Sequence, residues 1–524
     1  MSAGRKKILW VDGEIEFFRS QITFLETRGY SVIPVFNSVD LLSILHQNEK
    51  IGDLILIDDK VNGNDSSSII SEIRKINPNL PIVLISQGES ERPKKGVTGA
   101  KSDAIITRPV TTSQILSICK KLVNPSRAAS QRVKESFVRS YSEIKTTLSS
   151  NVSLKDFYRI YEILVNWDLE IENTGDEGLR QTLSGLKSDT AIAFSNFIVH
   201  SYGLWINKPE NAPLLGHYVI EKIVRPLLTK DKKSILVVIS GMRFDQYIYI
   251  EKALNELYKV NRQFFLSTLP SSEEFSRNAF FAGELPFHIA AKYPDLLSEP
   301  VDSSKTNPNR REDILLYKNF SENGTLISDS EPYYSIIHST DDAANILNKI
   351  QACHSSQLIT LTLDIDEHVS HFGFNAQEIN DFRSDENSRR LLTDIWFQKS
   401  ELLKVLNLLA SQNVNLILTS DHGSVLCSRA TEIYNTQNIL KNRRYKFGRD
   451  ISADERRIVF ISDPLHFGLP SFGEQTNFLI AKENFYFSHP EKFEFYQKEY
   501  SASFQKGGIS PEEMIMPLGI FQAK

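Results

Sequence analysis

Cysteine is scarce in this chain of 524 residues, and its three cysteines, Cys119, Cys353 and Cys427, lie far apart without any CxxC spacing. Their distribution excludes a disulfide framework and a thiolate zinc site. No apolar run reaches the ~18 residues that span a bilayer, and Asp12 and Glu14 interrupt the first run too early for a signal-peptide core. We therefore expect a cytoplasmic protein that makes no contact with a membrane.

An excess of charge of one sign is also missing, because 60 Lys and Arg residues stand against 65 Asp and Glu residues and leave a net charge of −5. Proteins that coat nucleic acid or anionic membranes are usually far more basic. A helix-turn-helix pattern is absent too, which disfavours a DNA-binding transcription factor. The length instead predicts a globular protein of several domains.

Short β-branched runs alternate with helical patterns in residues 1–124, which predicts a doubly wound parallel sheet. The predicted strands cover 8–11, 32–36, 54–57, 82–85 and 104–107. Ligands of such sheets gather at the carboxyl ends of the strands. Polar residues stand there in this chain, namely Asp12, Asp58, Ser86 and Arg108.

Strand signals disappear over residues 125–233, where helical periodicity predicts a bundle with helices at 137–148, 154–169, 179–197 and 215–228. From 234 to 524 the alternation returns and predicts a second α/β domain. Its predicted elements are strands over 235–239, 358–363, 416–419 and 458–461 and an amphipathic helix over 390–409.

The N-terminal pattern resembles the receiver domain of two-component response regulators. The resemblance implies Asp58 as phosphoacceptor, Mg²⁺ held by Asp12, Glu14 and Asp58, and Ser86 and Arg108 as the switch residues that stabilise charge on the phosphoryl oxygens. The pattern departs from the family where a second acid is replaced by glycine at position 13 and a lysine by Arg108. Both departures predict slow phosphorylation of Asp58.

Two groups of potential metal ligands follow strands of the C-terminal domain. Asp421 and His422 directly follow an apolar strand, and Glu367 and His371 are four residues apart. That spacing places two ligands on one face of a helical turn, and carboxylate with imidazole suits zinc. Two metals about 4 Å apart form a common clamp for phosphate ester hydrolysis.

Further sequence words resemble the PglZ domain, a branch of the alkaline phosphatase superfamily: MRFDQ at 242–246, SRNAFF at 276–281, RYKFGR at 444–449 and FQKGGISPEEM at 504–514. With the receiver pattern and the helical middle, the whole chain resembles the PorX-like response regulators of type IX secretion. This resemblance implies two zinc ions, hydrolysis of phosphodiesters such as oligonucleotides and phosphorylation by a histidine kinase. It also implies an extracytoplasmic-function sigma factor as partner and a homodimer on activation.

Three positions depart from the PglZ pattern. Ser240 stands where the family has a metal-binding aspartate, Glu273 at the position of the nucleophilic threonine, and Lys506 at the position of a histidine. The remaining zinc ligands are Asp421 with His422, and His371 with Glu367 or Asp366. Because each site retains about two ligands where catalytic zinc needs three, we expect a pseudoenzyme. The alternative is an active zinc-dependent phosphodiesterase that acts on oligonucleotides.

A basic run over 441–449 contains Arg443, Arg444 and Lys446 without an acid. A solvated hairpin and a phosphate contact beside the metal cleft both fit this pattern, and Tyr445 is available to stack on a nucleotide base.

Overall fold

The computed structural model divides the chain into two compact units, Met1–Ser140 and Tyr141–Lys524. It describes residues 6–27, 30–47, 52–61, 64–78, 80–86, 102–111, 114–115, 118–119, 122, 125–172, 176–229, 232–294, 311–322, 331–338, 346, 348, 350, 356–370, 385–412, 414–434, 442–473 and 475–524. Each unit has its own sheets and its own apolar core.

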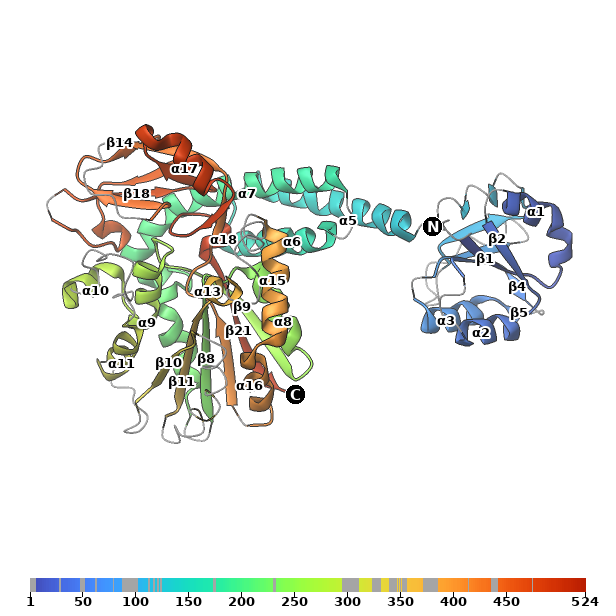
Figure 1. Cartoon of the computed structure of the whole chain (residues 1–524), viewed down its shortest axis with the longest axis horizontal. Coiled ribbons are helices and arrows are strands. Elements are labelled where there is room, and N and C mark those ends of the chain that lie inside the picture. The colour runs from blue at the N-terminus through green and yellow to red at the C-terminus, as the bar shows by residue number, and fades with distance from the viewer. Residues whose placement is uncertain are drawn as a thin grey trace. The chain divides into compact units, whose positions relative to one another are not determined.

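The N-terminal unit contains a five-stranded sheet in which all neighbouring strands are parallel (Figure 1). Its spatial order is β2-β1-β3-β6-β7. The strands are β1 (Lys6–Val11), β2 (Tyr30–Val35), β3 (Leu54–Asp58), β6 (Ile82–Ser86) and β7 (Ala104–Thr107), and the helices include α1 (Arg19–Thr27), α2 (Ser38–Gln47) and α3 (Ser67–Ile76). The predicted doubly wound sheet is therefore confirmed, with its five strands close to their predicted ranges.

Both faces of this sheet are covered. Successive side chains of a strand point to opposite faces, so Ile8 and Trp10 of β1 pack into one apolar cluster while Leu9 and Val11 pack into another. All four side chains are fully buried, as expected for a parallel strand between two layers of helices. The next residue, Asp12, is thereby delivered to the carboxyl edge of the sheet.

The C-terminal unit contains a six-stranded sheet of spatial order β10-β11-β8-β12-β21-β9. The first four of these strands are parallel to one another, and β21 is antiparallel to both of its neighbours. The strands are β8 (Lys233–Ser240), β9 (Tyr258–Leu266), β10 (Tyr333–Ile336), β11 (Leu358–Asp364), β12 (Val414–Thr419) and β21 (Ile515–Ala523). Only β8, β11 and β12 were predicted.

Helices cover both faces of the larger sheet (Figure 1). From β8, Val237 packs into a cluster with α6, α7, α8, α15 and α16, whereas Val238 packs into a second cluster with α9, α10 and α11. The sheet-covering helices named above are α6 (Leu154–Glu172), α7 (Glu177–Asn207), α8 (Phe244–Leu254), α9 (Asn278–Ala282), α10 (Pro286–Lys292), α11 (Glu312–Glu322), α15 (Glu386–Lys399) and α16 (Glu401–Leu409). The other described helices from residue 125 onward are α5 (Pro125–Leu148), α13 (Ile365–Ser370), α17 (Phe493–Tyr500) and α18 (Pro511–Met514).

Two predicted helices are interrupted. The helix expected over 390–409 breaks at Ser400, whose side chain instead caps α16 by accepting the N–H of Leu403. The helix expected over 215–228 forms three short turns, the last of which contains Pro226; proline cannot donate to an α-helical ladder. The predicted domain boundaries after residues 124 and 233 stay a prediction.

Smaller sheets complete the C-terminal unit. One sheet consists of β13 (Val425–Cys427) and β20 (Ser503–Gln505). A second has the order β16 (Ser452–Ala453), β14 (Arg429–Tyr434) and β19 (Phe485–Ser488). A third has the order β15 (Tyr445–Gly448), β18 (Asn477–Ala481) and β17 (Ile458–Ile461). The strand predicted over 458–461 thus exists but belongs to an antiparallel sheet of its own. Within the residues described above, none of the helices has the length and apolar character to cross a membrane.

Candidate functional site

The first site lies at the carboxyl edge of the N-terminal sheet. Asp12 follows β1, Asp58 ends β3 and Arg108 follows β7. Arg108 Nη2 donates hydrogen bonds to Asp12 Oδ2 and to Asp58 Oδ1, both at 2.8 Å. The two carboxylates are almost completely buried, whereas the Arg108 side chain is 23% exposed. The fold therefore brings the predicted acceptor, a predicted metal ligand and the predicted cation together.

Burial raises the pKa of Asp58 above its ordinary value, and the hydrogen bond and charge of Arg108 lower it only in part. The neighbouring charge of Asp12 adds to the increase. Ionised Asp58 consequently depends on a cation beside it.

The two other predicted residues of this site take different positions. Ser86 ends β6, and its carbonyl oxygen accepts the backbone N–H of Arg108 at 2.9 Å. Glu14 is exposed, and its backbone N–H donates to Asp12 Oδ1 at 2.8 Å. Glu14 thus joins the site through its backbone, while its side chain lies on the surface.

Magnesium requires a near-octahedral set of oxygen ligands. Arg108 already takes an oxygen of each buried carboxylate, and no group of three His, Cys, Asp or Glu residues is placed to hold a metal ion anywhere in the described part of the chain. As arranged here, Asp12, Glu14 and Asp58 do not fit Mg²⁺.

The second site lies at the carboxyl edge of the C-terminal sheet. Ser240 ends β8, and Asp421 and His422 follow β12 with no exposed surface. Ser240 Oγ donates to Asp421 Oδ2 at 3.1 Å, and His422 Nδ1 lies 3.0 Å from the same oxygen. The sheet thus joins two predicted zinc ligands to the serine that replaces a third.

A buried arginine that was not predicted, Arg277, occupies the centre of this site. Its Nε donates to Asp421 Oδ2 at 3.0 Å, and Nη2 donates to Ser240 Oγ. Nη1 lies 3.4 Å from Glu312 Oε1, and Nη2 lies 4.0 Å from Asp364 Oδ2. Burial lowers the pKa of Arg277, but these carboxylates raise it further than burial lowers it. Arg277 is therefore a permanent positive charge among carboxylates.

The position of the predicted nucleophile is held in an ion pair. Glu273 begins the π-helical turn Glu273–Arg277, and Lys506 Nζ donates to its Oε1. Its other oxygen, Oε2, lies 3.9 Å from His422 Nε2. Burial would raise the pKa of Glu273, but the charges of Lys506 and His422 lower it to about 2. Glu273 thus neutralises Lys506 and holds it in the site.

The other predicted half-site is only partly described. Glu367 lies on α13, with Oε1 3.7 Å from His338 Nδ1. Asp366 forms an ion pair with Arg389. His371 falls outside the described residues, so its pairing with Glu367 stays a prediction.

Zinc needs at least three protein ligands in a catalytic site and four in a structural site. Arg277 and Lys506 instead place positive charges directly on Asp421 and Glu273, and a protonated lysine cannot ligate a metal. Together with the lack of any three-ligand group among the described residues, this arrangement does not fit zinc.

Two family models match this chain, and one of them covers the C-terminal site. The model of the BREX system PglZ alkaline phosphatase-like domain matches residues 219–520, more than half of the chain. The chain belongs to the PglZ family. A second model, the PorX response regulator linker domain, matches residues 127–206. With the five-stranded N-terminal sheet, these matches fit a receiver plus PglZ architecture.

Solved structures similar to the N-terminal part are response regulator receiver domains. One from Clostridium thermocellum is 22% identical, one from Methanospirillum hungatei 24% and one from Sinorhizobium medicae 25%. Each alignment covers 23% of this chain and 94% of the other, with TM-scores of 0.20, 0.21 and 0.20. No curated protein matches the chain.

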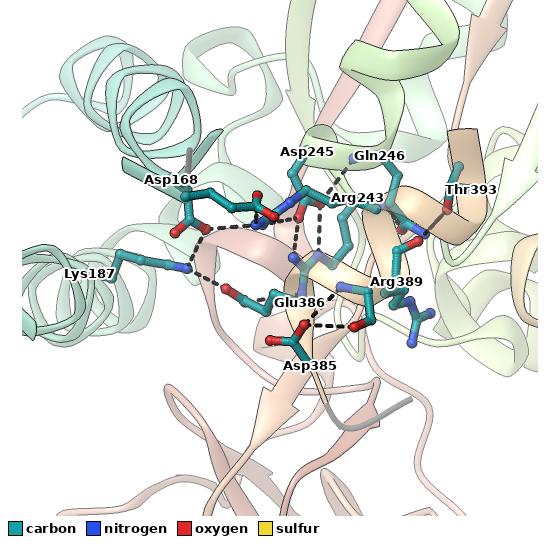
Figure 2. A network of polar contacts seen from close by, with 12 residues as sticks. Asp168, Lys187, Arg243, Asp245, Gln246, Asp385, Glu386, Arg389 and Thr393 are labelled. Atoms are coloured by element: carbon teal, nitrogen blue, oxygen red, sulfur yellow. Dashed lines mark hydrogen bonds and ion pairs between the residues drawn. The ribbon is translucent and has the colours of Figure 1, made fainter. Parts of the chain in front are cut away.

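The MRFDQ word of the PglZ domain forms a buried ion network (Figure 2). Arg243 Nε donates to Asp245 Oδ1 at 2.9 Å, and Nη1 donates to Glu386 Oε1 at 3.2 Å. Lys187 of α7 donates to Glu386 Oε2 at 2.6 Å and to Asp168 Oδ2 of α6 at 3.0 Å. This word therefore ties α6 and α7 to the PglZ domain.

The predicted phosphate contacts are used inside the PglZ domain. Arg444 is fully buried and donates to Glu513 Oε1 at 3.0 Å, and Lys446 is only 3% exposed. Arg443 lies over the ring of Tyr500 at 4.4 Å and donates to its hydroxyl at 2.8 Å. The prediction is corrected for Arg444 and Lys446, since buried cations cannot contact a phosphate backbone.

Sequence reasoning missed Arg277 and Glu312. Arg277 stands in the SRNAFF word that indicated the PglZ domain, so its presence was noted without a role. Glu312 reaches the site from α11 and is almost completely buried. It carries no local sequence signal, because a glutamate at the start of a helix is common.

Proposed function

We propose that this chain is a PorX-type response regulator in which Asp58 accepts a phosphoryl group and the PglZ domain acts through protein contacts without catalysis. The observation that carries the proposal is the pair of cations in the PglZ centre, where Arg277 is bonded to Asp421 and Lys506 to Glu273. Asp421 stands at a metal-binding position and Glu273 at the position of the nucleophile, and each carboxylate is thereby hydrogen-bonded to a cationic side chain of the same chain. The proposed domains are a receiver over 1–124, a helical linker over 125–233 and a PglZ domain over 234–524.

In the proposed phosphorylation, an oxygen of Asp58 attacks the phosphorus of a phosphohistidine on a histidine kinase. The P–N bond breaks, a P–O bond of an acyl phosphate forms, and the departing imidazole takes up a proton. Ser86 and Arg108 are the proposed partners of the phosphoryl oxygens, and Mg²⁺ is the metal that receiver chemistry implies.

The PorX linker match supports a proposal for the cellular setting. We propose cytoplasmic regulation of type IX secretion, with an extracytoplasmic-function sigma factor as partner and a homodimer formed after phosphorylation. A nucleotide is a possible ligand of the PglZ domain, bound without turnover.

Incubation of the full chain with acetyl phosphate and Mg²⁺, followed by intact-mass analysis, tests the receiver assignment. We expect an adduct of about 80 Da, one phosphoryl group, in the wild type and none in Asp58→Ala. Ser71 is half-buried on α3, where its hydroxyl donates to the Ser67 carbonyl oxygen at 2.9 Å, and Ser71→Ala provides a control away from Asp58. An adduct that persists in Asp58→Ala contradicts the assignment.

Turnover of bis-p-nitrophenyl phosphate in the presence of zinc tests the absence of catalysis. We expect none from the wild type. The triple variant Ser240→Asp, Glu273→Thr, Lys506→His restores the family residues, and we expect it to bind more zinc. Wild-type hydrolysis that is lost in Asp421→Ala overturns the proposal.

An active phosphodiesterase remains the second candidate, and one observation favours it. Asp421 Oδ1 and His422 Nε2 are buried without a hydrogen-bond partner among the described residues, and a metal ion satisfies such atoms well. Elemental analysis separates the candidates: two tightly held zinc ions per chain support the phosphodiesterase, and none supports the regulator.

A further inference from the structure

Arg108 differs from an ordinary surface arginine because its charge is shared between two buried carboxylates. A single nitrogen, Nη2, bridges two carboxylates from different strands at 2.8 Å each. Asp12 and Asp58 are 3% and 9% exposed, so solvent contributes little to their stabilisation. The bridging nitrogen therefore holds the position between two buried anions where a divalent cation binds best.

The charges around this position leave little attraction for a metal. Asp12 and Asp58 supply two negative charges and Arg108 returns one. Glycine at position 13 adds no carboxylate, and Glu14 lies on the exposed surface. The charge of Asp59 also acts on Asp58, but a divalent cation approaching the bridged pair meets a guanidinium at close range.

The rest of the arginine can leave without opening the core. Its side chain is 23% exposed, and its Nε is buried without a hydrogen-bond partner in the described structure. Cζ lies 5.2 Å from the centre of the Phe18 ring, a cation–π contact worth little more than a weak hydrogen bond. The two carboxylates are thus the main groups that hold the guanidinium in place.

We propose that Arg108 is a tethered cation that competes with the divalent metal for Asp12 and Asp58, so that metal binds only when Arg108 swings out of the site. This inference rests on the proposed receiver function and adds its regulation. Once it has left the two carboxylates, Arg108 is available to contact the phosphoryl oxygens on Asp58.

Manganese titration of the full chain, followed by the electron paramagnetic resonance signal of free Mn²⁺, tests the competition. We expect Arg108→Ala to bind one Mn²⁺ at least about tenfold more tightly than the wild type, because one positive charge beside the site is removed. Arg108→Ala/Asp12→Asn identifies the site, since the gained binding should disappear in it. Arg108→Lys preserves the charge and should give an intermediate affinity. It also serves as the folded variant if Arg108→Ala is unstable.

Equal Mn²⁺ affinity in the wild type, Arg108→Ala and Arg108→Lys overturns the competition. Acetyl phosphate labelling of the same proteins separates this failure from that of the receiver function. Labelling of Asp58 with equal metal affinities leaves the receiver function standing and removes the tethered cation. Tighter metal binding in Arg108→Ala without labelling in any variant keeps the tethered cation and removes Asp58 as acceptor.

Discussion

The two sheet edges of this protein place an arginine among carboxylates in different ways. In the N-terminal site, Arg108 approaches two acids from a side chain that is 23% exposed. In the PglZ centre, Arg277 is 4% exposed and meets Asp421 and Glu312, with Lys506 close by on Glu273. Solvent reaches one guanidinium, whereas the other lies inside the core, so we expect the first to be removable and the second to be a fixed part of the structure.

The largest expected effect comes from removing the fixed cation. Arg277→Met leaves Asp421 and Glu312 buried without their shared partner, and we expect a loss of about 3–5 kcal/mol in the free energy of unfolding. Urea denaturation of the C-terminal unit measures this loss. Arg277→Met/Asp421→Asn should recover part of it, and a single variant as stable as the wild type contradicts the fixed role.

Lys446 adds a further buried side chain to the comparison, and its pKa lies below the ordinary value for lysine. Burial and the charge of Arg443 lower the pKa of Lys446 to about 7, whereas Glu273 raises the pKa of the partly exposed Lys506 despite the opposing effect of desolvation. Between pH 7 and 10 the unfolded chain binds more protons at position 446 than the folded chain, so stability rises with pH.

In Lys446→Met, the increase in the free energy of unfolding between pH 7 and 9.5 should be smaller than in the wild type by up to about 3 kcal/mol. Urea midpoints of the C-terminal unit at the two pH values measure it. Lys404, on the exposed face of α16, gives the matched control Lys404→Met. Identical pH profiles for wild type and Lys446→Met contradict a depressed pKa.

Removal of the other arginine should cost much less stability. Arg108→Ala should destabilise the N-terminal unit by about 1–2 kcal/mol although Asp12 and Asp58 are buried, because the Arg108 side chain is itself 23% exposed and water can enter the space that it leaves. Thermal unfolding followed by circular dichroism gives the value. A loss as large as that of Arg277→Met removes the distinction between removable and fixed cations.

The smallest expected effect is that of chelation. If Arg277 and Lys506 replace metal in the PglZ centre, EDTA should leave the unfolding temperature of the C-terminal unit unchanged, since a ligand stabilises a protein only when it is bound. Differential scanning calorimetry with and without EDTA provides the comparison. A chelator-dependent decrease that zinc reverses favours the phosphodiesterase.

The sequence predicted all five strands of the N-terminal sheet but only β8, β11 and β12, in the middle of the larger sheet. Continuous apolar runs identify buried parallel strands, so the positions of Asp58 and Asp421 at strand ends followed directly. Strand β21 was missed because Pro517 and Gly519 are untypical of a central strand. Gly519 is required there because a Cβ at this position would lie 2.1 Å from the hydroxyl oxygen of Tyr247.

The role of Arg277 could not be predicted, because it depends on residues far apart in the chain. Asp421, Ser240 and Glu312 meet it from three different elements, and no local pattern indicates such convergence. The sequence did indicate that Lys506 stands at a ligand position, where a lysine changes the charge of the site. Its partner, Glu273, is found only in the folded chain.

The place of β21 in the sheet has a consequence during protein synthesis. Among the described strands, β21 is the one that pairs along the length of β9, and the ribosome makes β21 on the order of 250 residues later. At about 5–20 residues per second, β9 emerges tens of seconds before its partner and presents an unpaired strand edge to other nascent chains. We expect the growing chain to need a chaperone over this interval, and a tag that delays release of β21 should lower the soluble yield.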